Sequence, residues 1–358
     1  MSARAPRRLN AIYFRAAYNL PITLGLEHGV FARHGLDLEI TYTLGSRMSG
    51  ASLLSGAQDL GALALDDVVY EVEKRNADLF AFMGYNSGTI ELMARPGIQA
   101  ARDLAGRTLG VDDPASGFAF VAHRILQGMG LRRDAYETVP SGGGHHRAQA
   151  LKEGKIDAAM IAPPFSVELT TLGFIPLGCP LDHLPRYQGS VGVTTRRWAA
   201  TNSDTLVTYI CAYRESLQWT LDPANRAVAI AHLANDFALP RAIAARTYDA
   251  LADRREGLYR DADIDVPGIQ TVLDLRVENG LLTVPTPRPS KYYDTRYLRR
   301  SETYVADVPC KRRPARYPSR PRARAEQGDL PGRTMARTEL RMMPTFPSSP
   351  LQLVVISK

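Results

Sequence analysis

Two stretches of the chain share one sequence pattern, and this repetition constrains the fold more than any other feature. Leu53–Asp67 (LLSGAQDLGALALDD) and Leu151–Phe165 (LKEGKIDAAMIAPPF) align without a gap, ninety-eight residues apart. Each reads as the end of a helix, a Gly turn, a short strand apolar on both faces and an abrupt polar or Pro-containing stop. Such strands are typical of parallel sheets covered on both faces. The repetition therefore predicts two similar α/β lobes.

The residues that follow each predicted strand are the first candidates for a functional site, because ligands of open α/β sheets bind beyond the carboxyl ends of the strands. Asp66 and Asp67 follow the first copy of the strand. Two adjacent carboxylates on such a loop could bind an amine or a ring N–H group. The alternative is helix capping, with Asp66 as the N-cap and Asp67 in the first turn.

The charge of the chain is concentrated at its C-terminal end. Of 44 Lys and Arg and 37 Asp and Glu, residues 299–358 contain 13 and 5, which leaves 31 and 32 in the rest of the chain. A nearly neutral body argues against a nucleic-acid partner. The three cysteines, Cys179, Cys211 and Cys310, show neither metal-ligand spacing nor a disulfide framework. We therefore expect no metal and no cofactor.

The sequence contains no apolar run long enough to span a bilayer. Its first residues, MSARAPRRLNAIYF, include basic side chains but lack the apolar region of a signal peptide. Two expectations follow: either the protein is cytosolic, or an export signal has been lost from the start of the sequence.

Apolar periodicity and Pro and Gly punctuation divide the chain into four parts. The first predicted strands lie between Leu9 and Arg95, and helical periodicity dominates beyond Ser203. The composition beyond Arg299 is rich in Arg and Pro with few large apolar residues, which is typical of disorder. We expect a first part of lobe 1 (9–92), lobe 2 (93–190), a mostly helical return to lobe 1 (191–298) and a disordered tail (299–358).

Three stretches together resemble one family. They are LPITLGLEHGVFARHGLDLEI (20–40), DLAGRTLGV (103–111), and ALKEGKIDAA (150–159) with Pro163-Pro164-Phe165. They resemble the substrate-binding proteins of ABC importers, and within them the NMT1/THI5-like group that binds nitrate, sulfonates, taurine and thiamine-precursor pyrimidines. The resemblance covers about residues 9–282.

This resemblance implies a periplasmic-binding-protein type 2-like fold, in which two Rossmann-like α/β lobes are joined by a two-strand hinge and close on a ligand. The crossovers would lie near Gly88–Arg95 and Gly189–Thr195. It also implies a small organic ligand, such as a sulfonate, a pyrimidine or a related aromatic or amine compound, an ABC importer permease as partner, and a periplasmic location. Many relatives carry Thr, Ser or Pro where this chain has Asp66 and Asp67, and this departure argues against a simple sulfonate or nitrate ligand.

The remaining candidate ligand-binding residues follow predicted strands or begin predicted helices. The N-terminus of a helix suits an anionic group of a ligand, and Arg47 could add a bidentate hydrogen-bonding partner. Serines at helix N-termini also serve as ordinary N-caps. Ser141–His146 (SGGGHH) lacks the Lys and the spacing of a phosphate-binding loop. Aromatic and Asn side chains could stack on or hydrogen-bond a flat ligand, or simply form turns. These candidates are Tyr18, Asn19, Ser46, Arg47, Asn86, Ser116, Gly117, His145 and Phe165.

The alternative to a binding protein is an enzyme on the same fold. Proteins of this architecture include decarboxylase-like proteins that act on dihydroxylated aromatic acids, and pyrimidine synthases of thiamine biosynthesis. Asp66, Asp67, His145 and His146 could serve as acid or base groups. No Lys stands at a predicted cleft position for a Schiff base, because Lys152 and Lys155 lie at the end of a predicted helix.

Overall fold

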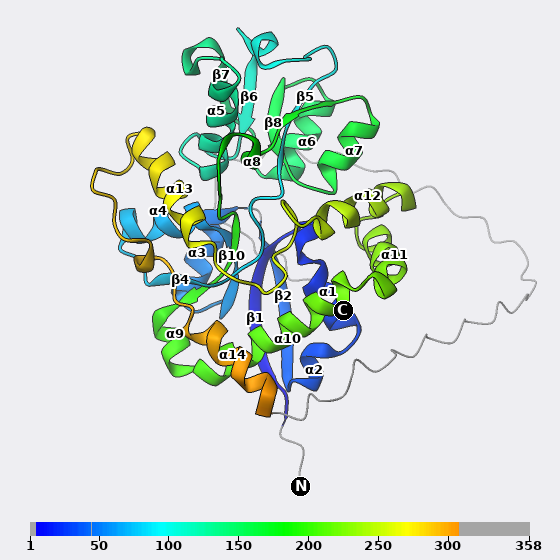
Figure 1. Cartoon of the computed structure of the whole chain (residues 1–358), viewed down its shortest axis with the longest axis vertical. Coiled ribbons are helices and arrows are strands. Elements are labelled where there is room, and N and C mark those ends of the chain that lie inside the picture. Colours follow the sequence, from blue (N-terminus) through cyan, green and yellow to red (C-terminus); the bar gives the residue numbers. More distant parts are fainter. Residues whose placement is uncertain (1–4, 44, 308–358) are drawn as a thin grey trace, which may run out of the picture.

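The computed structural model describes residues 5–43 and 45–307, which form two α/β lobes stacked along the long axis of the molecule (Figure 1). Each lobe is built on one five-stranded sheet. In spatial order, the lobe 1 sheet contains β2 (Leu36–Thr43), β1 (Arg7–Phe14), β3 (Leu60–Ala64), β10 (Ser190–Thr195) and β4 (Leu79–Gly84). The lobe 2 sheet contains β7 (Glu137–Pro140), β6 (Thr108–Val111), β8 (Ala158–Ile161), β5 (Glu91–Ala94) and β9 (Ile175–Gly178).

The two sheets have the same topology, which confirms the predicted pair of similar lobes. The repeated strand lies in the middle of each sheet, as β3 in lobe 1 and β8 in lobe 2. β3 is parallel to β1 and antiparallel to β10, and β8 is parallel to β6 and antiparallel to β5. Both antiparallel neighbours enter their sheet directly after the chain has crossed between the lobes.

The crossings themselves are residues 85–90 and 184–189. The family resemblance implied slightly later positions, near Gly88–Arg95 and Gly189–Thr195. Those ranges overlap β5 and β10, whose backbone groups are already paired within the two sheets. The connecting segments are therefore short, and they lie side by side: the backbone N–H of Gly189 donates to the carbonyl of Asn86 at 3.1 Å.

An Asp that occurs in both copies of the repeat fixes the start of each central strand. The Asp59 carboxylate accepts a hydrogen bond from the backbone N–H of Asn10 on β1 at 2.8 Å. The Asp157 carboxylate does the same for the backbone N–H of Thr108 on β6 at 3.0 Å. In both copies of the repeat, the same side-chain-to-backbone hydrogen bond therefore sets the register between two parallel strands.

A left-handed Gly precedes each of these strands. Gly56 has φ 78° and Gly154 has φ 70°, a region in which a side chain is strained. We expect Gly56→Ala and Gly154→Ala each to lower the free energy of unfolding by about 1–2 kcal/mol, as measured by urea denaturation. Gly144→Ala, at a helical position where an added Cβ would have no atom closer than 4.0 Å, is the control and should change stability by less than about 0.5 kcal/mol. Equal losses in all three variants would contradict this account.

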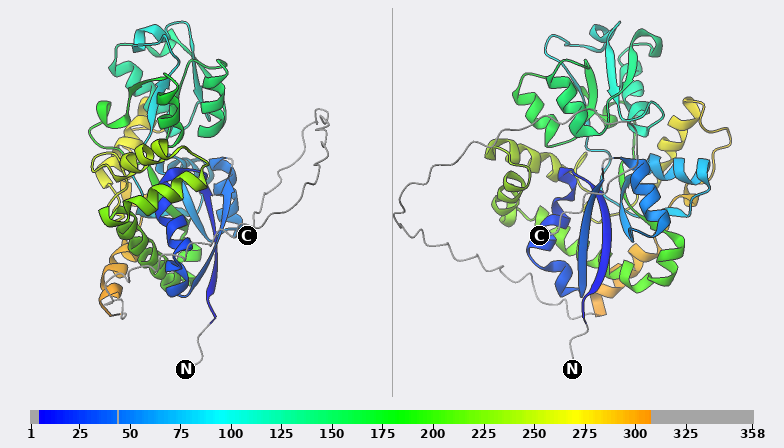
Figure 2. Two further views of the ribbon diagram at one scale, coloured as in Figure 1. Left: turned by 90° about the vertical axis from the view of Figure 1, so that its right-hand side faces the viewer. Right: turned by 180° about the vertical axis from the view of Figure 1, so that it is seen from behind.

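Helices cover both faces of each sheet (Figure 2). In lobe 1, apolar residues of β1 and β4 pack with α1, α2 and α10 in one cluster, while α3 and α4 contact β3 and β4. The lobe 1 helices are α1 (Leu20–Glu27), α2 (Val30–Arg33), α3 (Ser46–Ser55), α4 (Leu65–Arg75), α9 (Arg196–Thr201), α10 (Ser203–Leu221), α11 (Arg226–Asp236), α12 (Arg241–Ala252), α13 (Val266–Glu278) and α14 (Arg296–Asp307). The lobe 2 helices are α5 (Gly117–Gly128), α6 (Gly144–Lys152), α7 (Phe165–Thr171) and α8 (Pro180–His183).

The C-terminal part of the described chain corrects one expectation. The sequence predicted disorder from residue 299, but α14 continues to Asp307. It packs along α10 and buries Leu298 and Ser301 against it. The remainder of the predicted tail, 308–358, lies outside the described residues. Within the described part of the chain, none of the helices combines the length and apolarity needed to cross a lipid bilayer.

Two helical contacts connect the lobes on opposite sides of the junction. α13 packs against both α4 of lobe 1 and α5 of lobe 2, and α12 contacts α7 of lobe 2. In Figure 1, α13 and α12 flank the space between the sheets. Ion pairing adds to the first contact, since Arg124 on α5 bonds Glu278 on α13. The carboxyl edges of the two sheets are thus held facing each other.

Candidate functional site

A cavity of about 230 Å³ lies between the lobes. This is somewhat smaller than ordinary small-molecule pockets of about 300–1,000 Å³, so it suits a compact ligand. Residues of both lobes form its walls. The lining residues are Phe14, Gly45, Ser46, Arg47, Asp66, Asp67, Tyr70, Glu71 and Arg276 from lobe 1, and Asp112, Asp113, Ala115, Ser116, Gly142 and Gly143 from lobe 2.

Four helices begin at this cavity, because helices that follow parallel strands start at the carboxyl edge of the sheet. Ser46 is the first residue of α3, and Asp66 and Asp67 lie in the first turn of α4. Ser116 is the N-cap of α5, and Gly143 is the N-cap of α6. The positive ends of the helix dipoles thus face the cavity, and most of the acidic side chains at its wall lie next to them.

Asp66 is engaged by an arginine from a distant part of the chain. The carboxylate accepts two hydrogen bonds from the Arg276 guanidinium, from Nε at 2.7 Å and from Nη2 at 2.7 Å. Both side chains are almost fully buried, at 2% and 1% exposure. Arg276 also lies over the rings of Tyr70 and Phe120. Asp66 is therefore not the helix cap considered in the sequence analysis; the N-cap of α4 is Ala64, and the Asp66 side chain binds α13 to the cavity wall.

Asp67, in contrast, forms no ion pair with any of the described residues. Burial, the neighbouring Asp66 carboxylate and the Asp112 carboxylate of lobe 2 raise the pKa of Asp67 to about 8, while a hydrogen bond from Ser46 and the charge of Arg276 act in the opposite direction. At neutral pH the Asp67 carboxyl group is therefore mostly protonated, and it can donate as well as accept a hydrogen bond.

The lobe 2 wall is held by the polar contacts of two side chains, Ser116 and Arg147. Ser116 donates to the Asp112 carboxylate at 2.6 Å while it accepts from the backbone N–H of Ala119. Arg147 is buried and donates to the carbonyls of Gly142, at 2.6 Å, and of Met160. Its guanidinium lies 3.9 Å from Asp112. These contacts fix the carboxylate of Asp112 and the glycine loop at the cavity.

An ion pair joins the lobes at the rim of the cavity. Arg47 on α3 of lobe 1 bonds Asp113 in the β6–α5 turn of lobe 2. Both side chains are substantially exposed, at 63% and 36%, so the pair is solvent-accessible. A surface pair of this kind contributes little to stability, and it can break when the lobes separate.

Five of the predicted ligand-binding residues line the cavity: Ser46, Arg47, Asp66, Asp67 and Ser116. Of three others, Gly117 contacts a lining residue, and Tyr18 and Asn86 contact the crossing segments. Gly117 donates its backbone N–H to Asp66, and a Cβ on Gly117 would lie 2.4 Å from the Asp66 Cβ, which makes it a close-approach glycine. Tyr18 packs on Tyr85 at a centroid distance of 6.1 Å. Asn86 accepts from the backbone N–H groups of Gly88 and Ser190, so it organises the crossings.

The remaining three predicted residues are not among those that line the cavity. The rings of His145 and Phe165 are tilted by 54° with their centroids 5.2 Å apart, and Phe165 meets Phe237 of lobe 1 edge-on at a centroid distance of 6.5 Å. They form an aromatic contact between the lobes. Asn19 donates to the Phe14 carbonyl at 2.6 Å and borders a depression that has essentially no room for a water molecule.

The family assignment follows from comparison with known proteins. A family model described as NMT1/THI5 like matches residues 16–227, more than half of the chain. The chain belongs to the NMT1/THI5-like family. This confirms the resemblance seen in the sequence. A search of the curated proteins finds no match to this NMT1/THI5-like chain.

Solved structures resemble the NMT1/THI5-like protein over most of its length. The alkanesulfonate-binding protein SsuA from Xanthomonas axonopodis pv. citri is 18% identical with a TM-score of 0.67, covering 82% of this chain and 99% of its own. The periplasmic nitrate-binding protein NrtA from Synechocystis PCC 6803 is 11% identical with a TM-score of 0.71, covering 86% and 91%. The desulfurization enzyme DszB is 16% identical with a TM-score of 0.59, covering 83% and 99%. At these identities the likeness establishes the fold, a periplasmic-binding-protein fold.

Sequence reasoning about this NMT1/THI5-like protein missed much of the cavity. Asp112 and Asp113 directly follow the family-like stretch 103–111, so their position was a usable signal, as it was for Asp66. Gly142 and Gly143 belong to the stretch Ser141–His146, which was considered from the sequence only as a phosphate-binding loop. Arg276 had no local signal, since it lies on a helix that reads as ordinary amphipathic surface. The missed lining residues are Phe14, Gly45, Tyr70, Glu71, Asp112, Asp113, Ala115, Gly142, Gly143 and Arg276.

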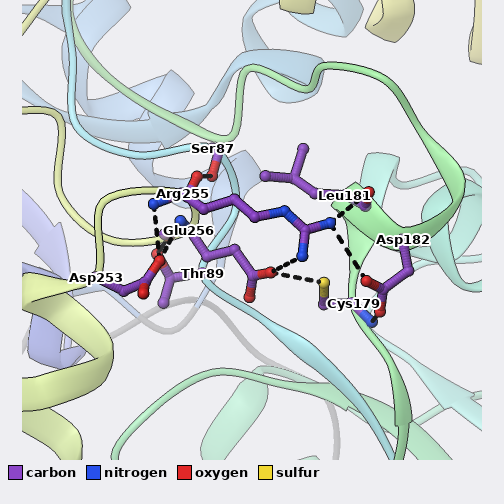
Figure 3. A network of polar contacts seen from close by, with 8 residues as sticks. All are labelled: Ser87, Thr89, Cys179, Leu181, Asp182, Asp253, Arg255 and Glu256. Atoms are coloured by element: carbon purple, nitrogen blue, oxygen red, sulfur yellow. Dashed lines mark hydrogen bonds and ion pairs between the residues drawn. The ribbon is translucent and has the colours of Figure 1, made fainter.

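A second polar cluster links the lobes beside the crossings (Figure 3). Among the described residues, Cys179, Asp182 and Glu256 are the one group of His, Cys, Asp and Glu side chains with ligand atoms close enough, within 4.8 Å of one another, to hold a metal ion. Arg255 forms ion pairs with both carboxylates, and burial together with Glu256 raises the pKa of the Cys179 thiol to about 12. A neutral thiol and compensated carboxylates fit a contact between lobes better than a metal site.

This cluster predicts an unreactive thiol at Cys179. In a Cys310→Ser background, we expect slow modification of Cys179 by a disulfide reagent at pH 8, since the thiolate is the reacting form. Glu256→Gln removes the nearest negative charge, so the rate should increase about tenfold for each unit by which the pKa of Cys179 falls. Glu153→Gln, at the exposed end of α6, should leave the rate unchanged. Rapid modification of Cys179 in the parent protein would contradict the burial described here.

Proposed function

We propose that the protein is a solute-binding protein that encloses a small organic molecule between its lobes and presents it to the permease of an ABC importer, outside the cytoplasm. The observation that carries this proposal is the 230 Å³ cavity, whose walls come from both lobes. A ligand that contacts both walls has a higher affinity for the closed arrangement than for the open one. It therefore drives closure by population shift.

Three further observations support the proposal. The crossings are short, as in hinge-closing proteins. The exposed Arg47–Asp113 pair at the rim can break on opening. Among structures of the same fold are proteins named as alkanesulfonate-binding, nitrate-binding, and a ligand-binding component of an ABC-type import system.

The proposal is tested by thermal-shift screening of the purified protein against sulfonates, pyrimidines, amines and aromatic acids. A ligand present at about a hundred times its Kd stabilises the folded protein by about 2.7 kcal/mol, which corresponds to a shift in Tm of roughly 5 °C or more. Recovery of the unaltered compound from the complex is expected. A complete absence of stabilising compounds in all four classes would count against the proposal.

An enzyme on the same fold is the second candidate, because one observation favours it. A carboxyl group with a pKa of about 8 in a cavity is matched to general acid catalysis near neutral pH. However, no Lys, Cys or His is found among the described residues that line the cavity, so a Schiff base or thiol mechanism has no group there. Conversion of a bound compound, abolished in Asp67→Asn, would establish the enzyme and overturn the binding-protein proposal.

A further inference from the structure

We infer, resting on the proposed function, that the ligand of this cavity is a small organic cation whose positive group carries N–H donors, held between Asp67 of lobe 1 and Asp112 of lobe 2. Amines, amidines and guanidines have this chemistry. The inference depends on the identity of the charged side chains at the cavity, on the contacts that already occupy them and on the lobes from which they come.

The charge of the cavity wall is the first argument. Five carboxyl side chains line the cavity, against two guanidinium groups. Both guanidinium groups are already bound to carboxylates, Arg276 to Asp66 in the buried pair and Arg47 to Asp113 at the rim. No arginine that lines the cavity is therefore left to pair with an anionic ligand. Asp67, in contrast, forms no ion pair with a described residue, although the nearby charge of Arg276 lowers its pKa. Asp112 has the Arg147 guanidinium at 3.9 Å, beyond hydrogen-bonding distance.

The helix N-termini at the cavity give the second argument. On their own, the first turns of α3, α4, α5 and α6 would favour an anion. In this protein the chain supplies the anions itself, with Asp66 and Asp67 in the first turn of α4 and Asp112 and Asp113 just before α5. At neutral pH a sulfonate or carboxylate entering the cavity would meet the carboxylates of Asp112 and Asp113. Little water separates the charges when the lobes are in contact, so this repulsion is weakly screened.

Closure follows from the same arrangement. Asp112 of lobe 2 already acts on Asp67 of lobe 1 across the cavity, since its charge raises the pKa of Asp67. When both groups are ionised and the cavity holds no cation, they oppose approach of the lobes. A cation between them converts this repulsion into two attractive contacts. The charged and titratable groups that face Asp67 are Asp66 and Glu71 on α4, Arg47 on α3, Arg276 on α13, Asp112 and Asp113 in the β6–α5 turn, Tyr18 and Tyr187.

The inference is tested with ligand pairs that match in shape and differ in charge. Benzamidine is compared with benzoate, and propylamine with propionate, by isothermal titration calorimetry at pH 7.5, with ethanesulfonate as a further anion. We expect the cation of at least one pair to bind at least tenfold more tightly than its anion. If an anion binds more tightly, the inference is wrong while the proposed function stands. If no compound of the broader screen binds either, the proposed function itself fails.

Variants assign the effect to the two carboxylates. Asp67→Asn and Asp112→Asn keep the side-chain shape and should each weaken binding of the preferred cation at least tenfold. Asp134→Asn removes an equal charge from an exposed turn of lobe 2 and should leave the affinity unchanged. Circular dichroism and Tm establish that the variants are folded. Unchanged cation affinity in both cavity variants would overturn the inference.

The pH dependence of binding supplies an independent readout. A cation prefers the ionised form of Asp67, so binding below pH 8 should release a proton from this group. The ionised fraction of a group with a pKa of about 8 rises about fifteenfold between pH 6.5 and pH 8, and the affinity should rise with it. Asp67→Asn should abolish this dependence. An affinity that falls over this range in the parent protein would contradict the inference.

Discussion

Replacing Arg276 by Met is expected to lower the free energy of unfolding by about 3–5 kcal/mol. The substitution leaves the buried Asp66 carboxylate without the two hydrogen bonds and the positive charge that now compensate it. Burial of a carboxylate without a partner is strongly unfavourable, and Arg276 is also the side chain through which α13 holds the first turn of α4. Urea denaturation at pH 7 measures the loss.

Two further variants separate this effect from simple loss of a charge. Asp66→Leu added to Arg276→Met removes both charged partners and should recover much of the lost stability, because the cost arises from the uncompensated group. Arg226→Met makes the same substitution in the exposed pair with Asp249 and should cost less than about 1 kcal/mol. A loss of less than 1 kcal/mol for Arg276→Met would mean that the pair is not buried as described.

The stability of the protein is expected to fall by about 2 kcal/mol between pH 6.5 and pH 8.5, owing to Asp67. In the folded protein the pKa of Asp67 is raised to about 8, from an ordinary value of 3.8. Between these values the folded state binds a proton that the unfolded state does not. The stabilisation from this bound proton is complete at pH values below the pKa of Asp67 in the unfolded state. It is lost as the pH rises through the pKa of Asp67 in the folded state.

The pH range is chosen to separate Asp67 from the histidines. Burial lowers the pKa of His123 to about 4, so this group contributes the opposite trend, mainly below pH 6.5. Denaturation curves of the parent protein and of Asp67→Asn are compared at pH 6.5, 7.5 and 8.5, and the parent should lose stability relative to the variant across the series. Parallel curves for the two proteins would show that Asp67 is ionised throughout the range.

The general fold was predictable because its strongest signal is local. The repeated pattern around Gly56 and Gly154 encodes a left-handed turn, and the aspartate that follows each glycine sets a strand register through a backbone hydrogen bond. The glycine and the aspartate lie within a few consecutive residues in each copy of the repeat. The position of Asp66 and Asp67 at the end of a buried strand followed from the same pattern.

The chemistry of the cavity was less predictable because it depends on distant partners. Asp66 and Arg276 are 210 residues apart, and neither the acid nor the helix that carries the arginine indicates the pairing. As a result, the sequence could not show that Asp66 is paired with an arginine while Asp67 forms no ion pair within the described part of the chain. The alternative of helix capping by Asp66 failed for the same reason.

The analogy between the two copies of the repeat also had a limit. Phe165 follows β8 just as Asp67 follows β3, so both were expected at the ligand. α7, however, begins at Phe165 itself, and the ring is directed to His145 and Phe237. The lobe 2 wall is instead supplied by the turn after β6 and the glycine loop after β7. The sequence repeat thus predicts equivalent strands in the two lobes, but the residues that follow these strands do not take equivalent positions at the cavity.

The central claim is that two lobes close on a ligand held by both. It is tested most directly by pulsed electron–electron resonance between spin labels at Lys74→Cys on lobe 1 and Arg132→Cys on lobe 2, both exposed, with the native cysteines replaced. Adding the compound with the largest thermal shift should convert a broad distance distribution into a shorter and narrower one. An identical distribution with and without a compound that calorimetry shows to be bound would contradict the account.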